Sequence, residues 1–147
     1  VLMKEVTVKN LGKMEAVSFN GSTEFKLKPI TSPQENKQCT VNFVEVEPGG
    51  TAFGYHWHEM SEEVFFIISG NGSVKTTKGN VLVKAGDVIT FPAGPEGAHV
   101  ISNASQTEKL VYIDFDTKNP CDIVHFPDMK KVMPVGPFSQ GMYDEQQ

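Results

Sequence analysis

The sequence contains no arginine, because all 13 of its basic residues are lysines. Arginine carries a planar guanidinium group that grips a carboxylate or phosphate through two hydrogen bonds, whereas lysine is a flexible point charge. Ligands that need a guanidinium clamp are therefore disfavoured. A compositional bias of the source organism would explain the absence equally well, with the same chemical consequence.

Long apolar runs and clusters of basic residues are also missing. No stretch approaches the roughly 18 apolar residues that cross a bilayer, and residues 1–19 do not resemble a signal peptide. The net charge is -5 and the lysines are scattered, which argues against nucleic acid as a partner. We therefore expect a cytoplasmic protein that binds neither membrane nor nucleic acid. Its two cysteines, Cys39 and Cys121, are expected to be reduced thiols, with a single disulfide as the alternative.

The 147 residues suit one domain, and the hydrophobic pattern predicts an all-β fold. Short runs rich in Val, Ile, Phe, Tyr and Thr recur about every ten residues, with Gly, Pro, Asn and Asp between them, which is typical of a sandwich or barrel. The expected strands cover residues 40–47, 54–58, 63–69, 72–77, 80–84, 87–91, 99–102 and 109–116.

The two ends of the chain are less regular. Residues 1–39 are expected to form an N-terminal arm that packs on the barrel, with possible strands at 4–9, 15–19 and 24–30. The barrel itself would cover residues 40–116. Residues 117–147 hold one expected strand at 122–126 and several prolines and glycines, and are expected to wrap the barrel or a neighbouring subunit.

Three histidines and one glutamate form a candidate metal site. Residues two apart on a strand share a face, so His56 and His58 can point at one ion. Glu63 opens the next expected strand and shares a face with apolar residues, which favours it over Glu62. His99 begins another strand after a turn. Neutral imidazoles and an ionised carboxylate suit a first-row divalent transition metal, and the absence of a thiolate argues against a closed structural zinc site.

With these residues in place, the sequence resembles the cupin superfamily. The first cupin motif is matched at every position by Gly50, His56, His58, Glu63 and Gly70. The second cupin motif is matched by Gly86, Pro92, Gly94, His99 and Asn103. Here the four residues 95–98 separate Gly94 from His99, whereas the motif has two residues at this place. This insertion affects the shape of the loop more than the position of His99 on its strand.

The resemblance implies a small single-domain cupin with a double-stranded β-helix, or jelly-roll, barrel. It also implies that one divalent ion of Fe, Mn, Ni, Cu, Co or Zn is bound, and that the protein is a homodimer. The expected function is that of a dioxygenase-like or isomerase-like metalloenzyme acting on a small organic molecule. The alternative is a barrel that binds or senses a small molecule or carbohydrate without catalysis.

A further set of residues is expected to contact the ligand or take part in proton transfer. The expected pocket is apolar and aromatic, although core packing would explain each of its members equally well. Acid–base candidates lie on the last expected barrel strand, and Glu45 and His125 are weaker ones. The pocket set is Phe53, Tyr55, Met60, Phe65, Phe91 and Tyr112, and the catalytic candidates are Tyr112 and Asp114.

Overall fold

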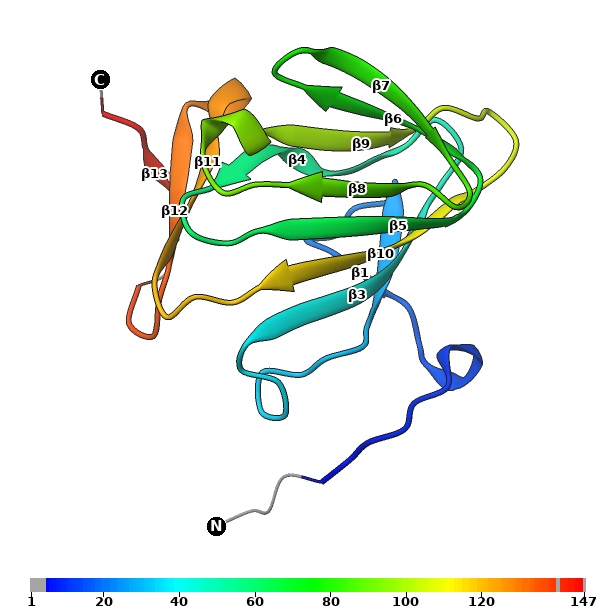
Figure 1. Cartoon of the computed structure of the whole chain (residues 1–147), viewed down its shortest axis with the longest axis horizontal. Helices are drawn as coiled ribbons and strands as arrows, with labels where there is room; N and C mark the ends of the chain where they lie inside the picture. Colours follow the sequence, from blue (N-terminus) through cyan, green and yellow to red (C-terminus); the bar gives the residue numbers. More distant parts are fainter. Residues whose placement is uncertain (1–4, 140, 147) are drawn as a thin grey trace.

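The computed structural model describes residues 5–139 and 141–146 and shows two antiparallel sheets that face each other as a jelly roll (Figure 1). The first sheet has six strands, in the order β1 (Val17–Ser18), β2 (Phe25–Pro29), β3 (Cys39–Val46), β10 (Leu110–Thr117), β5 (Glu63–Ser69) and β8 (Val88–Phe91). The second has seven, in the order β13 (Tyr143–Asp144), β12 (Lys131–Val135), β11 (Asp122–Phe126), β4 (Thr51–His58), β9 (His99–Asn103), β6 (Asn71–Thr76) and β7 (Gly79–Lys84).

Helical structure in the described residues is limited to three short 3₁₀ turns, η1 (Leu11–Lys13), η2 (Pro95–Gly97) and η3 (Pro127–Met129). None of these is long and apolar enough to cross a membrane. The all-β double-stranded β-helix expected from the sequence is confirmed, and every strand expected between residues 40 and 116 is present within a few residues of its expected bounds.

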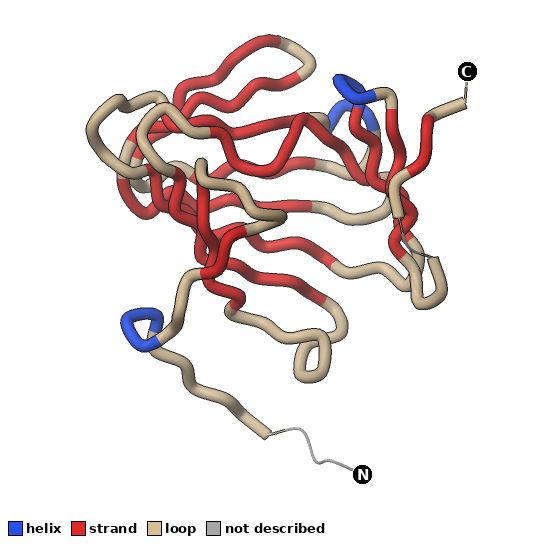
Figure 2. The backbone as a smooth tube through the Cα atoms, turned by 180° about the vertical axis from the view of Figure 1, so that it is seen from behind, coloured by secondary structure: helices blue, strands red, loops and turns tan. Residues whose placement is uncertain are grey.

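At the two ends of the chain, the strands expected at 15–19, 24–30 and 122–126 are present as β1, β2 and β11, whereas other expectations fail. Residues 5–9 form no strand and run away from the sheets (Figure 2), with Val6 and Val8 exposed to 96% and 94%, and Lys4 lies outside the described residues. The strands β12 and β13 were not expected, because Pro134 lies within β12 and proline lacks an amide hydrogen for a ladder. The division of the chain at residues 39 and 116 stays a prediction.

Side chains that face the inside of the barrel change from apolar to polar along β10 and β5. On β10 the inward-facing residues run from Leu110 and Tyr112 to Asp114 and Asp116, the first three of which are buried. The antiparallel register places Tyr112 opposite Ile67 and Asp116 opposite Glu63 on β5. The barrel therefore has an apolar end that forms the core and a polar end that can hold chemistry.

The apolar end is closed by the buried side chain of Asn103. Its amide donates to the carbonyls of Val46, Glu47 and Glu108 at 3.1, 3.2 and 2.8 Å, and its oxygen accepts from the amide of Ser105 at 2.9 Å. Buried polar groups are stable only when hydrogen-bonded, and here one side chain serves three segments. Asn103 therefore pins the loop that follows β9.

Candidate metal centre

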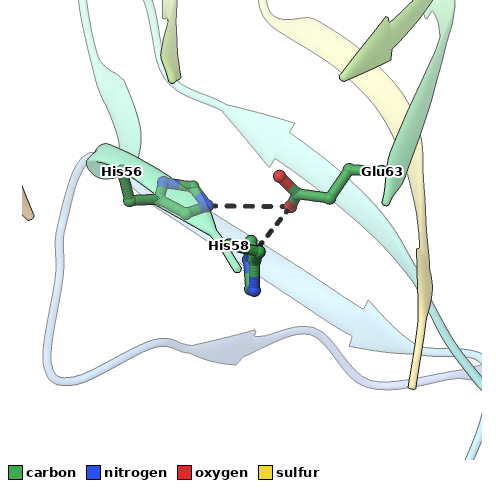
Figure 3. A group of neighbouring side chains, drawn as sticks. All are labelled: His56, His58 and Glu63. Atoms are coloured by element: carbon green, nitrogen blue, oxygen red, sulfur yellow. Dashed lines mark ion pairs between the residues drawn. The ribbon is translucent and has the colours of Figure 1, made fainter. Parts of the chain in front are cut away.

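Two histidines of β4 and one glutamate of β5 converge at the polar end of the barrel (Figure 3). One ligand atom from each of His56, His58 and Glu63 lies within 4.8 Å of the other two. The Nε2 atoms of His56 and His58 lie 3.6 and 3.8 Å from Oε1 of Glu63. The strand alternation that brings His56 and His58 to one face is the reason for this convergence.

His99 approaches the same carboxylate from the neighbouring strand β9. The register pairs it directly with His56, and the two rings lie 4.8 Å apart between centroids. Its Nε2 atom lies 3.2 Å from Oε2 of Glu63, and its side chain is only 1% exposed. All three histidines singled out from the sequence thus approach the carboxylate of Glu63, His56 and His58 at Oε1 and His99 at Oε2.

Each of the three imidazoles is fixed through its other nitrogen. Nδ1 of His56 donates to the carbonyl of Gly54 at 2.7 Å, and Nδ1 of His99 donates to the carbonyl of Gly97 at 2.8 Å. Because a carbonyl can only accept, the proton sits on Nδ1 and the lone pair on Nε2, which is the tautomer that binds metal. Nδ1 of His58 is held in the same way by Oδ2 of Asp122 at 2.7 Å.

Asp122 is a functional residue that sequence reasoning missed. It opens β11, 64 residues from His58, and its second oxygen accepts from the amides of Met60 and Ile123, both at 2.9 Å. Burial raises the pKa of this carboxyl, but the hydrogen bonds from His58 and Met60 outweigh burial and hold the pKa below its usual value. No local sequence signal marks Asp122, because its partner comes from a different part of the chain.

The charges of the cluster suit a cation. Burial lowers the pKa of His99 to about 4, so its Nε2 lone pair is free at neutral pH. Burial raises the pKa of Glu63, but the surrounding histidines outweigh it and bring the pKa to about 2, so the carboxylate is ionised. Burial also lowers the pKa of His56, but the hydrogen bond and charge of the neighbouring Glu63 outweigh burial, so the pKa lies above its usual value.

The buried Nε2 atom of His99 is the observation that tests the fit of a metal. It has no hydrogen-bond partner among the described residues, and leaving a buried polar atom without one is costly. A metal ion bound by His56, His58, Glu63 and His99 would satisfy it with nitrogen and oxygen donors of the kind that first-row transition metals accept.

Two further carboxyl groups, those of Asp114 and Asp116 on β10, lie beside Glu63 of the neighbouring strand β5. Burial raises the pKa of Asp114 to about 7, and burial together with the charges of Asp114 and Glu63 raises that of Asp116 to about 9. Asp114 was expected from the sequence as a catalytic candidate and Asp116 was not. Strand alternation could have identified Asp116, because it shares a face with Tyr112 and Asp114.

Two of the expected pocket residues lie next to His99, and a third packs against one of them. The ring of Phe91 stacks on the imidazole at 3.5 Å between centroids and 14° between planes, and the ring of Phe65 meets it edge-on at 5.4 Å. Tyr112 is fully buried and packs against Phe65 at 4.9 Å. These rings restrict the orientation of His99.

The structure places the other expected residues apart from the cluster. Phe53 packs against Phe19 and Phe25 at 5.1 and 4.8 Å between centroids. Tyr55 lies under Nζ of Lys75 at 4.2 Å, and Met60 is 58% exposed in the turn after β4. His125 stacks on Trp57, which alternates away from His56 and His58.

A comparison with protein-family models matches residues 42–116 to the cupin domain. Among solved structures, one described as a sugar phosphate isomerase from a cupin superfamily of Silicibacter pomeroyi superposes with a TM-score of 0.83. The alignment covers 95% of this chain and 93% of that one at 18% identity, which shows likeness of fold.

Two curated proteins also match. A probable oxalate decarboxylase of Arthroderma benhamiae is 36% identical over 81 residues, which are 52% of this chain but only 19% of that protein. An oxalate-binding protein of Thermotoga maritima is 27% identical over 109 residues, which are 74% of this chain and 85% of that protein. The chain thus spans about a fifth of the first relative and most of the second.

The raised pKa of Asp116 predicts how the metal-free protein responds to pH. An unfolded aspartate titrates near pH 4, whereas folded Asp116 titrates at about 9. Between these values the folded state keeps a proton that the unfolded state has lost, so stability falls as pH rises. The substitution Asp116→Asn removes this loss. We expect it to raise the melting temperature, and to do so more at about pH 8 than at about pH 5.

Thermal unfolding of the metal-free wild type and variant at both pH values measures the effect. Asp144→Asn is the matched control, because Asp144 is 88% exposed in its side chain and pairs with Lys131 at 2.7 Å. The control should not raise the melting temperature. An Asp116→Asn variant that is less stable than wild type at the higher pH would contradict the prediction.

Proposed function

This chain belongs to the cupin domain family, and on that premise we propose that it is a small metalloenzyme. Its site would consist of His56, His58, Glu63 and His99 around one divalent ion of Fe, Mn, Ni, Cu, Co or Zn. The substrate would be a small organic molecule, and the reaction that of a dioxygenase or an isomerase. The fold alone does not select a reaction, so the proposal rests on the site.

The observation that carries the proposal is the fixed orientation of the three imidazoles. All three Nδ1 atoms are tied to acceptors at 2.7 to 2.8 Å, and the Nε2 atoms face one ionised carboxylate. Metal-binding histidines are usually held by a hydrogen bond of this kind from the ring nitrogen that does not bind the metal. A purely structural role would not require the second nitrogen of all three histidines to face the same carboxylate.

A bound divalent transition metal would supply Lewis-acid or redox chemistry at this point. The residues on β10 supply the proton chemistry. The pKa of Asp114, raised by burial to about 7, lets its carboxyl both give and take a proton near neutral pH. The hydroxyl of Tyr112 points to the same interior, and its raised pKa keeps it protonated. Asp114 and Tyr112 are therefore the proposed proton-transfer residues.

The ligands after which the relatives are named are not assigned directly to this chain. One relative is described as acting on sugar phosphates and two are named for oxalate, all of which carry negative charge. This chain has no arginine to clamp such groups, and none of the lysines in the described residues pairs with Glu63, Asp114 or Asp116. We therefore favour a ligand without a carboxylate or phosphate group.

The second candidate function is binding without catalysis, in which the ion only orients a metabolite or carbohydrate. It is favoured by the oxalate-binding protein of Thermotoga maritima, which the match covers over 85% of its length. The two candidates share the metal site and differ in whether the ligand is converted.

Metal content tests what both candidates share. We expect about one divalent transition metal ion per chain by elemental analysis, because the four proposed ligands would form a single site. His99→Ala should lower the affinity by removing a ligand, and Asp122→Asn should lower it by about 10- to 100-fold by releasing His58.

His125→Ala is the matched control, because His125 lies outside the cluster, between Glu59 and Glu145 at 2.8 and 3.0 Å. Its affinity for metal should equal that of wild type. A wild-type protein that carries no metal and takes none up would overturn the proposal, as would equal losses in His99→Ala and His125→Ala.

Oxygen consumption separates the candidates. For the iron-loaded protein, a dioxygenase predicts oxygen uptake matched by loss of ligand across a panel of catechols, flavonols and keto acids. An isomerase predicts conversion of ligand without uptake, visible by NMR. The His56→Ala variant lacks one of the four proposed metal ligands and serves as the inactive control. No uptake and no conversion across the panel would favour the binding candidate.

We also propose that the protein is a homodimer, and the cytoplasmic location expected from the sequence stays a prediction. The outer face of the first sheet exposes four large apolar side chains on adjacent strands, and exposed apolar patches of this kind mark interfaces. They are Phe66, Ile68, Val88 and Phe115, exposed to 45%, 40%, 61% and 39%.

Light scattering at micromolar concentration should therefore give twice the 16.2 kDa mass of one chain. Phe66→Lys should shift the mass towards that of a monomer, because Phe66 lies opposite Val88 in the centre of this face. Lys78→Ala, at an exposed turn, should leave the mass unchanged. A wild-type monomer at this concentration would contradict the proposal.

A further inference from the structure

The residues of the candidate metal cluster come from two different sheets. The three histidines lie on β4 and β9 of the seven-stranded sheet, whereas Glu63 lies on β5 of the six-stranded sheet. Backbone ladders hold the strands of one sheet together, and the ladder neighbours of β5 are β10 and β8. The 3.6 and 3.8 Å distances from Nε2 of His56 and His58 to Oε1 of Glu63 therefore depend on how the two sheets are held together at this end of the barrel.

Two chain connections cross from one sheet to the other at this end (Figure 1). Residues 59–62 lead from His58 at the end of β4 to Glu63 at the start of β5, and residues 118–121 lead from β10 to β11. The first connection joins two members of the metal cluster directly. Its conformation therefore restricts how Glu63 can face the histidines of β4.

The beginning of the 59–62 connection is held by the start of β11. The amide of Glu59 donates to the carbonyl of Ile123 at 3.0 Å, and the amide of Met60 donates to Oδ1 of Asp122 at 2.9 Å. Oδ2 of Asp122 orients the ring of His58. The His58 end of the connection is thus held by the same strand that orients the histidine itself.

The end of the connection nearest to Glu63 is held by two other residues. Oγ1 of Thr117 accepts from the amide of Glu62 at 2.9 Å, and the amide of Thr117 donates back to the carbonyl of Glu62 at 2.9 Å. The side-chain amide of Asn119 donates to Oγ of the buried Ser61 at 3.2 Å. The two residues that precede Glu63 are thus tied to a segment that follows residue 116, where the match to the cupin domain ends.

We propose that Thr117 and Asn119 are positioning residues of the metal centre, which hold Glu63 at the distance from His56 and His58 that one ion requires. Without their hydrogen bonds, Glu63 would have to be ordered when the ion binds, and the cost of this ordering would weaken binding. This inference deepens the proposed function and rests on it, because the proposed ion is the group around which Glu63 is positioned.

Two substitutions remove these hydrogen bonds. Thr117→Val removes the hydroxyl and keeps the shape of the side chain, and Asn119→Ala removes the amide. We expect each to lower the affinity for Zn²⁺, measured by competition with a chelator, by about fivefold, which corresponds to the loss of one hydrogen bond. Thr117→Ser keeps the hydroxyl and should bind Zn²⁺ as tightly as wild type.

Thr31→Val is the matched control. Oγ1 of Thr31 accepts from the amide of Val41 at 2.8 Å, and the amide of Thr31 donates back to the carbonyl of Val41 at 3.3 Å, so the same reciprocal pair ties two segments outside both connections. We expect this substitution to lower the melting temperature and to leave the affinity for Zn²⁺ unchanged. Equal losses of affinity in Thr31→Val and Thr117→Val would overturn the proposal, because affinity would then follow stability alone.

The visible absorption of bound Co²⁺ is a second measurement, because it responds to the geometry of the ligands. We expect the bands to shift in Thr117→Val and Asn119→Ala and to coincide with those of wild type in Thr117→Ser and Thr31→Val. Melting curves show which variants are folded, and Asn119→Ala decides the test if Thr117→Val is not. Wild-type affinity and wild-type spectra in the folded variants would overturn the proposal.

NMR signals of the histidine rings in the metal-free protein distinguish this inference from the proposed function. We expect the signals of His56 and His58 to shift or broaden in Thr117→Val, because the carboxylate beside them is no longer held, and to stay unchanged in Thr31→Val. If wild type takes up no metal, the proposed function fails, and these signals still decide whether Thr117 positions Glu63. Unchanged signals in both variants would overturn the positioning role.

Discussion

The structure depends on how one buried carboxylate, that of Glu63, is compensated inside a β-barrel. An ionised group in an apolar interior is costly unless opposite charge or hydrogen bonds surround it. Here three imidazoles surround it, each held by its Nδ1 so that the Nε2 lone pair faces the carboxylate. Because these lone pairs do not neutralise a carboxylate, a cation bound between them would supply the opposite charge.

Local backbone irregularity provides two of the three acceptors. The pairing of β4 with β9 shifts between Ala52 and His56, and Phe53 adopts a positive φ of 58° there. Such a conformation persists only where the surroundings enforce it, and the packing of Phe53 on Phe19 and Phe25 does so. For His99 the acceptor is the carbonyl of Gly97 in η2, a helix built from the residues that lengthen the second motif. An added Cβ at Gly97 would collide with the carbonyl of Pro92.

Alternation and spacing are local properties, and they were enough to predict the barrel strands, the shared face of His56 and His58, and the choice of Glu63. The features that sequence reasoning missed depend on contacts between distant segments. Asp122 is linked to His58 across 64 residues, and nothing in its own neighbourhood marks it. The strand β12 contains Pro134, and it forms because β11 offers a ladder beside it. Asp116 was missed although its alternation with Tyr112 was visible, because acidic residues are seldom expected to face an interior.

The C-terminal strands lie outside the cupin domain match, which ends at residue 116, yet they complete the site. β11 pairs with β4 at Val124 opposite His58, Asp122 orients the ring of His58, and Phe126 stacks beside His56 at 5.9 Å. The inner ligands, Glu63 and His99, come from the matched region and are shielded from solvent. The outer ligands His56 and His58 are supported by the extension. The candidate metal cluster therefore depends on two parts of the chain, because its four residues come from the matched barrel while the contacts that orient His58 and cover His56 come from the strand after β10.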